Sequence, residues 1–509
     1  MRGLSAAVTS SLVCALLWLP GASGQAGQWT TAQANPQRTG WQQQADGISP
    51  QSVKNLKLLW KLDTHSQHMA LAGLVEPLIV SSGGRTLAVV AGASSDVYAI
   101  DANTGALVWQ HHLKWSSSEA EQSPADAPRG FICENGLIDV PVIANGNVYV
   151  IGQDGYMHTL SLASGEEVGS PFMATPHPYP KVNALNLENN VIYSIQGQGC
   201  GGNPNTVYAS DLATRKTSLL EPNQAGMWGN WGAAIGPNGN LYADTGDGAY
   251  NPKTNQLATS MLEVSPANKL VNYFTPSRYA WLTQRDLDMN FTPVIFPYNG
   301  ADYAVASGKE GRYYLVNIQT MGGANHETPE SETPLISNLN VNFQTEGSWG
   351  GASSWRDASG ATWFLAPTGG FTNPAVHFPV THGSAPNGGV IAMKLATVNG
   401  KAVLQPAWRS TDMITSQTPV IAGGVVFALG GGEFTGQAND NGSGLFSAME
   451  RVQLSVPAVL YALDAQTGAV LWHSGHEVTS FVHQGGVAVA DGKVIFGTND
   501  GTVYCYGLK

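Results

Sequence analysis

One sequence pattern occurs almost unchanged at two distant places in this chain. Residues 97–109 read VYAIDANTGALVW, and residues 460–472 read LYALDAQTGAVLW. Each copy has an alternating apolar segment, an Asp-x-x-Thr-Gly turn and a second segment that ends in Trp, which is typical of two strands and their connection. Repeated units of this kind bury their apolar faces against their neighbours, so the pattern predicts a ring of similar four-stranded sheets.

Weaker versions of the pattern divide the chain into eight units. The units are Leu74–Trp109, Gly136–Val168, Ala184–Leu220, Trp231–Phe274, Phe291–Met321, Gly347–Trp408, Thr418–Trp472 and residues 486–508. The last unit lacks a Trp-bearing strand, and Leu56–Leu62 offers one at the other end of the chain. Pairing of this segment with Thr502–Leu508 would close the ring and remove its open edges. The sequence therefore predicts an all-β fold, a single eight-bladed β-propeller over residues 25–509.

The repeated turn residues have a structural interpretation. Asp101 and Asp464 can accept hydrogen bonds from their own turns, and Gly105 and Gly468 can supply a positive φ. The Trp that ends each copy is expected to lie between blades as a packing wedge. Two units are lengthened, the sixth by an insertion at about Thr368–Asn387 and the seventh at about Glu433–Val456.

The first residues have the character of an export signal. Arg2 is followed by an apolar run from about Ala6 to Pro20, and Ala22-Ser23-Gly24 supplies small residues for cleavage. We expect residues 1–24 to be removed and the mature chain to begin near Gln25, in the periplasm or outside the cell. The run is shorter than the ~20 residues that a membrane span needs, and no other segment could span a bilayer.

Charge narrows the choice of partners. The formal net charge is −12, and charged residues make up only 12% of the chain. Nucleic acids and anionic membrane surfaces are therefore poor partners. A small molecule, a polymer or another protein of the cell envelope remains as the expected partner.

Three cysteines follow the signal. Cys133 and Cys200 lie in Gly-rich loops of neighbouring units. Disulfides form in the oxidising compartments that receive exported proteins, so these two cysteines are a candidate disulfide. Two free thiols are the alternative. Cys505 alternates within a terminal strand and is expected to be a small apolar filler.

The unit A-x-D-x-x-T-G-x-x-x-W resembles the repeat of the pyrroloquinoline quinone (PQQ) propeller superfamily. That superfamily includes the quinoprotein alcohol and methanol dehydrogenases, and also non-catalytic propellers such as the assembly lipoprotein of the outer-membrane β-barrel machinery. The lead-in Trp29…Asn35-Pro36-Gln37-Arg38-Thr39-Gly40 resembles that of the superfamily as well. The resemblance covers nearly the whole mature chain and implies the propeller fold.

Blades four and five resemble the cofactor half of the alcohol dehydrogenases. The resemblance implies that Trp231 lies under the quinone ring, that Asn251 binds calcium, and that Asp286 is the catalytic base and a metal ligand. It also implies that Asp288 neighbours the cofactor and that Lys309 polarises the quinone carbonyls. PQQ and Ca²⁺ are the cofactors so implied, and the activity is an alcohol oxidation.

The chain also departs from that family. Cys200 stands where the family has a calcium-binding Glu, and a thiol is a poor ligand for a hard cation. Cys133 is followed by Glu134, so the adjacent cysteine pair that caps the quinone is missing. The sequence contains no Cys-x-x-Cys-His, so no covalently attached haem is expected.

The repeat also predicts which residues ring the top of the central pore. They are His68, Glu134, Asn183, Trp231, Asp286, Asp288, Trp349, Thr415 and His483. A polar and aromatic ring of this kind suits a ligand funnel, but a water-filled pore has the same character. Asp286 and Asp288 could instead cap a turn, and Lys309 could be an exposed hairpin residue.

One further acidic stretch has the spacing of a cation site. Asp244, Asp247 and Asn251, with glycines between them, resemble a calcium loop but lack its closing Glu.

Three functions follow from these observations. The first is a quinoprotein-like oxidoreductase. The second is a non-catalytic propeller that binds a protein, peptide or saccharide in the cell envelope. The third is an enzyme acting on a polymer, with the insertion near Phe371–Asn387 shaping a groove.

Overall fold

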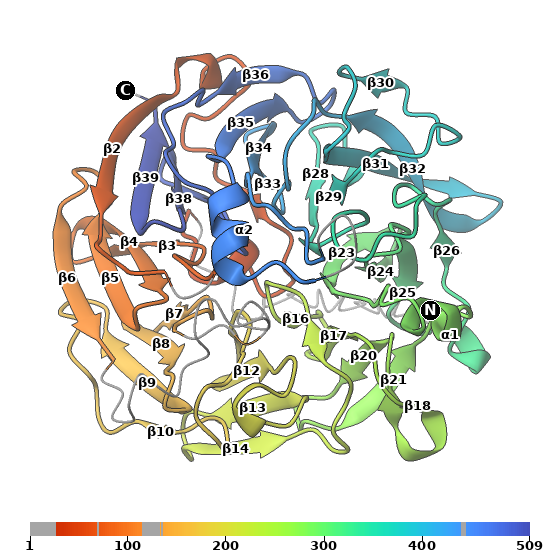
Figure 1. Ribbon diagram of the computed structural model, residues 1–509, viewed down its shortest axis with the longest axis horizontal. Helices are drawn as coiled ribbons and strands as arrows, with labels where there is room; N and C mark the ends of the chain where they lie inside the picture. Colours follow the sequence, from red (N-terminus) through yellow and green to blue (C-terminus); the bar gives the residue numbers. More distant parts are fainter. Residues whose placement is uncertain (1–26, 69–70, 114–132, 134–135, 439–443, 509) are drawn as a thin grey trace, which may run out of the picture.

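The computed structural model describes residues 27–68, 71–113, 133, 136–438 and 444–508. Their strands form eight sheets arranged around a central axis, which confirms the predicted eight-bladed all-β propeller (Figure 1). The predicted export signal, residues 1–24, lies outside the described residues. In the described part of the chain, no helix has both the length and the apolar composition needed to cross a membrane.

Each blade is a mainly antiparallel sheet whose strands follow one another outward from the axis. The first blade is β3 (Leu78–Ser82), β4 (Arg85–Gly92), β5 (Asp96–Asp101) and β6 (Leu107–His112). The second is β7 (Val142–Ala144), β8 (Asn147–Ile151), β9 (Tyr156–Ser161) and β10 (Phe172–Met173). The third is β11 (Asn186–Glu188), β12 (Val191–Ile195), β13 (Val207–Asp211) and β14 (Lys216–Leu219).

The fourth and fifth blades carry short extra elements. In the fourth, β15 (Met227–Trp228) and β16 (Ala234–Ile235) both pair with β17 (Leu241–Thr245), and β20 (Met261–Val264) and β21 (Leu270–Phe274) follow. A hairpin of β18 (Tyr250–Asn251) and β19 (Gln256–Leu257) projects from it, and helix α1 (Tyr279–Thr283) leads to the next blade. The fifth is β23 (Val294–Tyr298), β24 (Ala301–Ala306), β25 (Tyr314–Asn317) and β26 (Ser331–Glu332).

The last three blades complete the ring. The sixth is β28 (Ser353–Arg356), β29 (Thr362–Gly369), β31 (Gly388–Val398), β32 (Lys401–Arg409) and β30 (Val380–Thr381). The seventh is β1 (Trp41–Gln42), β33 (Val420–Ala422), β34 (Val425–Gly430), β35 (Val459–Asp464) and β36 (Val470–His473), with helix α2 (Ala448–Leu454) inserted between β34 and β35. The eighth is β37 (Ala488–Ala490), β38 (Lys493–Gly497), β39 (Thr502–Gly507) and β2 (Lys57–Asp63).

The ring closes as predicted. Strand β2 pairs antiparallel with β39, with Lys57 opposite Gly507 and Asp63 opposite Thr502. The outer strands β10 and β26 lie beyond the unit ends at Val168 and Met321 that the repeat predicted, because longer turns precede them.

Outer-strand tryptophans join neighbouring blades by a common contact. Trp109 of the first blade donates Nε1–H to the Leu162 carbonyl of the second, at 3.0 Å. A Cβ on Gly165 would lie 2.5 Å from the Trp109 ring, so the indole rests directly on the glycine of the neighbouring turn. Trp60 makes the same contact with Gly105, and Trp408 with Gly468. The glycines at these turns therefore serve both the positive φ and the packing of the next blade.

The predicted turn hydrogen bonds are also present. Asp101 Oδ1 accepts from the amides of Asn103 and Thr104, and Asp464 Oδ1 accepts from those of Gln466 and Thr467. These residues hold the turns of the fold together, as the sequence indicated.

The segment Trp29–Gln42, here called the base segment, winds once around the hub. It contacts the inner strand of every blade in turn by hydrogen bonds. These involve Ile79, Ile143, Leu185, Ile235, Ile295, Ser354, Ile421 and Val489. Each contact lies near the start of the strand, so the base segment closes the central channel and ties all eight blades to one stretch of chain.

Two charged side chains lie at the centre of this base. Arg38 donates to the carbonyls of Ala32 and Leu185 at 2.8 and 2.9 Å. The Glu76 carboxylate accepts from Trp29 Nε1, Gln33 N and Gln33 Nε2 at 2.7, 2.8 and 3.0 Å. Burial raises the pKa of Glu76 to about 7 and lowers that of Arg38 to about 9. The Arg and Trp of the lead-in sequence thus serve the closure of the channel.

The cysteines occupy two different environments. Cys133 and Cys200 form a disulfide with a Cα–Cα distance of 5.5 Å, which links loops of the second and third blades. Cys505 is free and buried within β39, where it acts as the small filler that its position predicted.

Candidate functional site

A cavity of about 600 Å³ lies at the hub, above the base segment. It is lined by loops that precede the inner strands of blades three to eight, including Trp228, Asn290, Trp349, Thr418 and Gln484. Insertions of the sixth and seventh blades form its rim, and α2 lies over the centre of the ring (Figure 1). Side chains from six blades therefore converge on one space.

Lys309 joins two carboxylates on the wall formed by the fifth blade. Its Nζ lies 2.7 Å from Asp286 Oδ1, to which it donates a hydrogen bond, and 2.6 Å from Asp288 Oδ1. The second contact is a close ion pair between the ammonium and a buried carboxylate. The Lys309 and Asp288 side chains are 7% and 3% exposed, whereas that of Asp286 is 47% exposed. Asp286 is therefore the carboxylate of the pair that a ligand in the cavity reaches first.

A third carboxylate completes this group. One oxygen each of Asp247, Asp286 and Asp288 lies within 4.8 Å of the others. Asp247 Oδ1 is buried and accepts no hydrogen bond from the described residues, and both amide atoms of the neighbouring cavity residue Asn290 are likewise unpartnered. Buried polar atoms are nearly always hydrogen-bonded in folded proteins, so these atoms mark a place for a ligand or water. We call Asp247, Asp286, Asp288 and Lys309 the acidic cluster.

Two glycines allow the acidic cluster to form. A Cβ on Gly308 would lie 2.2 Å from the Asp288 carbonyl oxygen, so the turn that carries Lys309 rests directly on the Asp288 backbone. A Cβ on Gly246 would lie 2.5 Å from Trp228 Nε1 and 2.6 Å from Asp288 Oδ2. A larger residue at either position would push the elements of the cluster apart.

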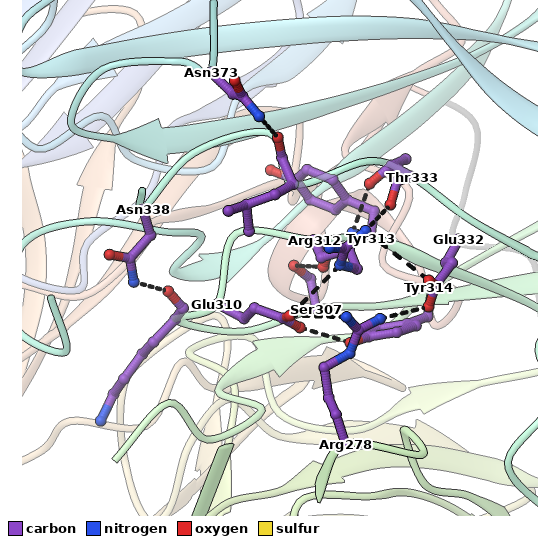
Figure 2. Close-up of polar contacts among 12 residues, drawn as sticks. Arg278, Ser307, Glu310, Arg312, Tyr313, Tyr314, Glu332, Thr333, Asn338 and Asn373 are labelled. Atoms are coloured by element: carbon purple, nitrogen blue, oxygen red, sulfur yellow. Dashed lines mark hydrogen bonds and ion pairs between the residues drawn. The ribbon is translucent and has the colours of Figure 1, made fainter. Parts of the chain in front are cut away.

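A polar network behind the turn holds Lys309 in place (Figure 2). Glu310 accepts a hydrogen bond from Tyr314 Oη at 2.6 Å and lies 3.5 Å from Arg278 and 3.4 Å from Arg312. Asn338 Nδ2 donates to the Lys309 carbonyl at 2.5 Å. The backbone of the Lys309 turn is therefore fixed by residues that do not reach the cavity themselves.

The protonation of the acidic cluster follows from burial and mutual repulsion. Burial, followed by the charges of Asp288 and Asp286, raises the pKa of Asp247 to about 7. Burial also raises the pKa of Asp288, against the opposing effect of Lys309. For Lys309, burial lowers the pKa, but Asp288 and Asp286 outweigh it and the net pKa is raised. Near neutral pH, Lys309 keeps its charge and Asp247 is poised to lose or gain a proton.

A second charged group lies on the far wall, which blades seven and eight form. The Glu433 carboxylate lies 2.6 Å from Arg451 Nη2 and 2.8 Å from His483 Nδ1. Arg451 projects from α2, whose Ala448 packs with Leu71 and Phe481. The repeat marks only His483 of this group, because Glu433 and Arg451 belong to the insertion of the seventh blade.

The structure brings together some of the expected site residues and separates others. Asp286, Asp288 and Lys309 meet at the cavity as the sequence predicted. Trp231 does not line the cavity: it is 1% exposed, and its Nε1 donates to Thr418 Oγ1 at 2.8 Å in the layer beneath. Trp228 and Trp349 line the cavity instead. Asn251, which was expected to bind a metal ion, also lies outside the cavity, because the β18–β19 hairpin carries it to the exposed surface.

The predicted pore ring is correct in part. Asp286, Asp288, Trp349, Thr415 and His483 line the cavity. His68 and Asn183 do not line it, and Glu134 lies outside the described residues. Asp247, which the sequence marked only as part of a weak calcium-loop pattern, proves to be the third acid of the cluster.

Comparison with known proteins supports the fold. The sequence family described as outer membrane protein assembly factor BamB matches residues 32–218 and 457–508, somewhat less than half of the chain. No curated protein sequence matches significantly.

Solved structures match over nearly the whole chain. A europium-containing methanol dehydrogenase has a TM-score of 0.61 and 15% identity, over 96% of this chain and 99% of that chain. A quinohemoprotein alcohol dehydrogenase from Comamonas testosteroni has a TM-score of 0.56 and 14% identity, over 96% of this chain and 81% of its own. A third such enzyme, from Pseudomonas putida, has a TM-score of 0.57 and 16% identity, over 95% and 80% of the two chains. At this identity the likeness is one of fold.

Proposed function

Because this chain is a β-propeller of the PQQ type, we propose that it is a quinoprotein-like oxidoreductase that oxidises an alcohol at the hub cavity. The observation that carries the proposal is the acidic cluster, in which three carboxylates and Lys309 meet inside a cavity large enough for a cofactor and a substrate. The names of the structural neighbours, a methanol dehydrogenase and two alcohol dehydrogenases, support the same reaction class.

A metal ion fits the acidic cluster. Carboxylate oxygens are the ligands that Ca²⁺ and similar hard cations prefer, and Asp247, Asp286 and Asp288 would hold the ion. The buried Asp247 Oδ1, which accepts no hydrogen bond from the described residues, is available for it. The Asp286 and Asp288 oxygens that contact Lys309 become available when the ammonium moves aside. The set differs from the one the resemblance implied, because the Cys200 sulfur is committed to Cys133 and Asn251 is outside the cavity. Asp247, which lines the cavity beside Asp286 and Asp288, would take the place of the missing ligands.

A planar quinone also suits the cavity. Trp228 and Trp349 offer flat aromatic surfaces, and each has an ammonium group near its ring, Lys181 at 5.6 Å and Lys309 at 5.4 Å. These groups match the rings and carboxylates of PQQ. When bound, the quinone supplies the two-electron acceptor that no amino-acid side chain offers.

The side chains of this chain would then share the remaining work. Asp286, the more exposed carboxylate, takes the proton of the alcohol hydroxyl as general base. Lys309 keeps its charge and would donate a hydrogen bond toward the electron acceptor. The network of Glu310, Arg278 and Asn338 keeps the Lys309 turn in place during the reaction.

The test is reconstitution of the purified protein with PQQ together with Ca²⁺ or La³⁺. We expect quinone absorbance to remain with the protein after gel filtration and an artificial dye to be reduced when an alcohol is added. Asp286→Asn should retain the cofactor and lose turnover by about 10²-fold or more. Asp464→Asn, the same change in an outer turn, is the matched control. Absence of cofactor binding at micromolar concentration would refute the proposal.

We also propose that the protein is exported. The disulfide between Cys133 and Cys200 supports this location, because such bonds persist in oxidising compartments. N-terminal sequencing of the protein recovered from the periplasm or medium should give a start near Gln25, whereas an intact Met1 in the cytoplasmic fraction would contradict export.

A further inference from the structure

Lys309, Asp286 and Asp288 on one wall of the cavity, and Arg451 and Glu433 on the other, contact partners of opposite charge. Lys309 is paired with Asp286 and Asp288, and Arg451 and His483 are both paired with Glu433. The far wall formed by blades seven and eight therefore offers little unbalanced charge to a ligand. A charged ligand would have to displace one of these contacts to be recognised there.

The groups that remain available are neutral. Side chains of Gln198, Asn230, Asn290, Thr345, Gln437 and Gln484 line the cavity and form no hydrogen bond with the described part of the chain. Asn290 is the most telling of them, because it is 4% exposed and both of its amide atoms are buried without a partner. An amide supplies a donor and an acceptor side by side, which matches a hydroxyl group or a pair of neighbouring hydroxyls.

The size of the cavity favours the same kind of ligand. The volume of about 600 Å³ lies in the range of pockets that enclose a drug-sized ligand, which is far more than a short aliphatic alcohol needs.

We propose that the natural substrate of this cavity is a neutral, polyhydroxylated molecule, a saccharide or a sugar alcohol. The proposal rests on the proposed function for the reacting hydroxyl, which meets the acidic cluster. The far wall holds the rest of the molecule, where the Gln437 and Gln484 amides donate to and accept from its hydroxyls. A site built to bind hydroxyl groups rejects analogues that lack them, because its buried polar groups would then be left unpaired.

The experiment is a calorimetric titration of the full-length, disulfide-intact protein, run with and without Ca²⁺ and without any quinone. The ligands are sorbitol and maltose as neutral polyols, 1-hexanol as an alcohol of similar length with one hydroxyl, and gluconate as an anion of similar shape to sorbitol. We expect one of the neutral polyols to bind, 1-hexanol to give no binding, and gluconate to bind more weakly than sorbitol. Gln437→Leu and Gln484→Leu should each weaken polyol binding by roughly fivefold, whereas Gln466→Leu, in an outer turn, should not change it.

Each outcome decides the matter. If neither polyol binds under either condition, or if 1-hexanol or gluconate binds as tightly as the polyol that binds, the inference is wrong. A parallel dye-reduction assay with PQQ and Ca²⁺ separates this result from failure of the proposed function. Polyol binding without dye reduction removes the redox function and leaves the ligand class standing. Dye reduction by short alcohols without polyol binding removes the ligand class and leaves the redox function standing.

Discussion

Two buried charged groups lie at the hub, one at the base and one in the cavity, and they differ in what surrounds them. At the base, the Glu76 carboxylate accepts three hydrogen bonds from the chain, and Arg38 bonds to the base segment and the third blade. In the cavity, Asp247 and Asn290 keep buried atoms without partners among the described residues. The first group is completed by the protein itself, and the second is completed by something that the protein binds. The comparison separates residues that hold the fold from residues that act.

The largest loss of stability is expected from a substitution in the Glu76–Arg38 group at the base segment. Arg38→Met removes the donors to Ala32 and Leu185 and leaves Glu76 buried without a nearby cation, so we expect a loss of about 3–5 kcal/mol in the free energy of unfolding. The midpoint of urea unfolding reports the change. Arg85→Met, on an exposed position of the first blade, is the control. Equal midpoints for the two variants would mean that the base segment does not secure the ring.

A smaller effect is expected at Gly246, where the cavity wall is closely packed. Gly246→Ala places a Cβ within 2.6 Å of both Trp228 and Asp288, so it should cost about 1–3 kcal/mol and change the Trp fluorescence. Gly226→Ala also lies on the cavity wall, but its Cβ would meet no atom closer than 3.5 Å. Urea unfolding of the two variants checks this contrast. Equal stabilities would mean that Trp228 and Asp288 do not lie against Gly246.

In the acidic cluster, removal of a charge should stabilise the fold. Asp247→Asn removes a carboxylate whose pKa is raised to about 7 by burial and by its acidic neighbours. At pH 8 and without metal, we expect a gain of roughly 1 kcal/mol, a reduced value because solvent screens this partly exposed group. Added Ca²⁺ or La³⁺ should raise the melting temperature of the wild type and not of the variant. If Asp247→Asn destabilised the protein, Asp247 would be a residue that stabilises the fold, which would contradict this prediction.

The smallest effect is a pH dependence. A carboxyl group with a raised pKa in the folded state binds its proton more tightly there than in the unfolded chain, where its pKa is about 4. Its contribution to stability therefore falls as the pH rises from about 4 to about 7, and stays level above. Glu76 and Asp139 have raised pKa values in the same range, so the signal is the difference between wild type and Asp247→Asn. A difference that does not change between pH 5 and 8 would contradict the raised pKa of Asp247.

Most of the fold could be predicted because its signals are local and repeated. The Asp-x-x-Thr-Gly turn fixes its own geometry at Asp101 and Asp464, and the Trp that follows fixes the packing of the next blade. Closure by Leu56–Leu62 followed from the strand missing at the other end of the chain. The winding of the base segment around all the blades could not be read in this way, because it depends on contacts with eight distant strands.

The site was predicted less well, because some of its residues lie outside the regular strands and others lie in an insertion that has no repeat. Asp286, Asp288 and Lys309 stand next to strands, so the repeat placed them correctly. Trp231 and Asp247 stand in irregular loops, where a shift of one residue decides which side chain faces the axis, and Asn251 stands in the short β18–β19 hairpin that leads away from it. Glu433 and Arg451 belong to an insertion without any repeat, and nothing in their spacing brings them to His483.

The central claim is that the acidic cluster is a cation site and that the Glu76–Arg38 group at the base segment is not. Crystals soaked in La³⁺ and measured for its anomalous scattering test it most directly. The account predicts one strong peak among the carboxylates of Asp247, Asp286 and Asp288, with the Lys309 ammonium moved aside, and none near Glu76. A map with no peak at the cluster, and with Lys309 still bound to Asp286, would contradict it.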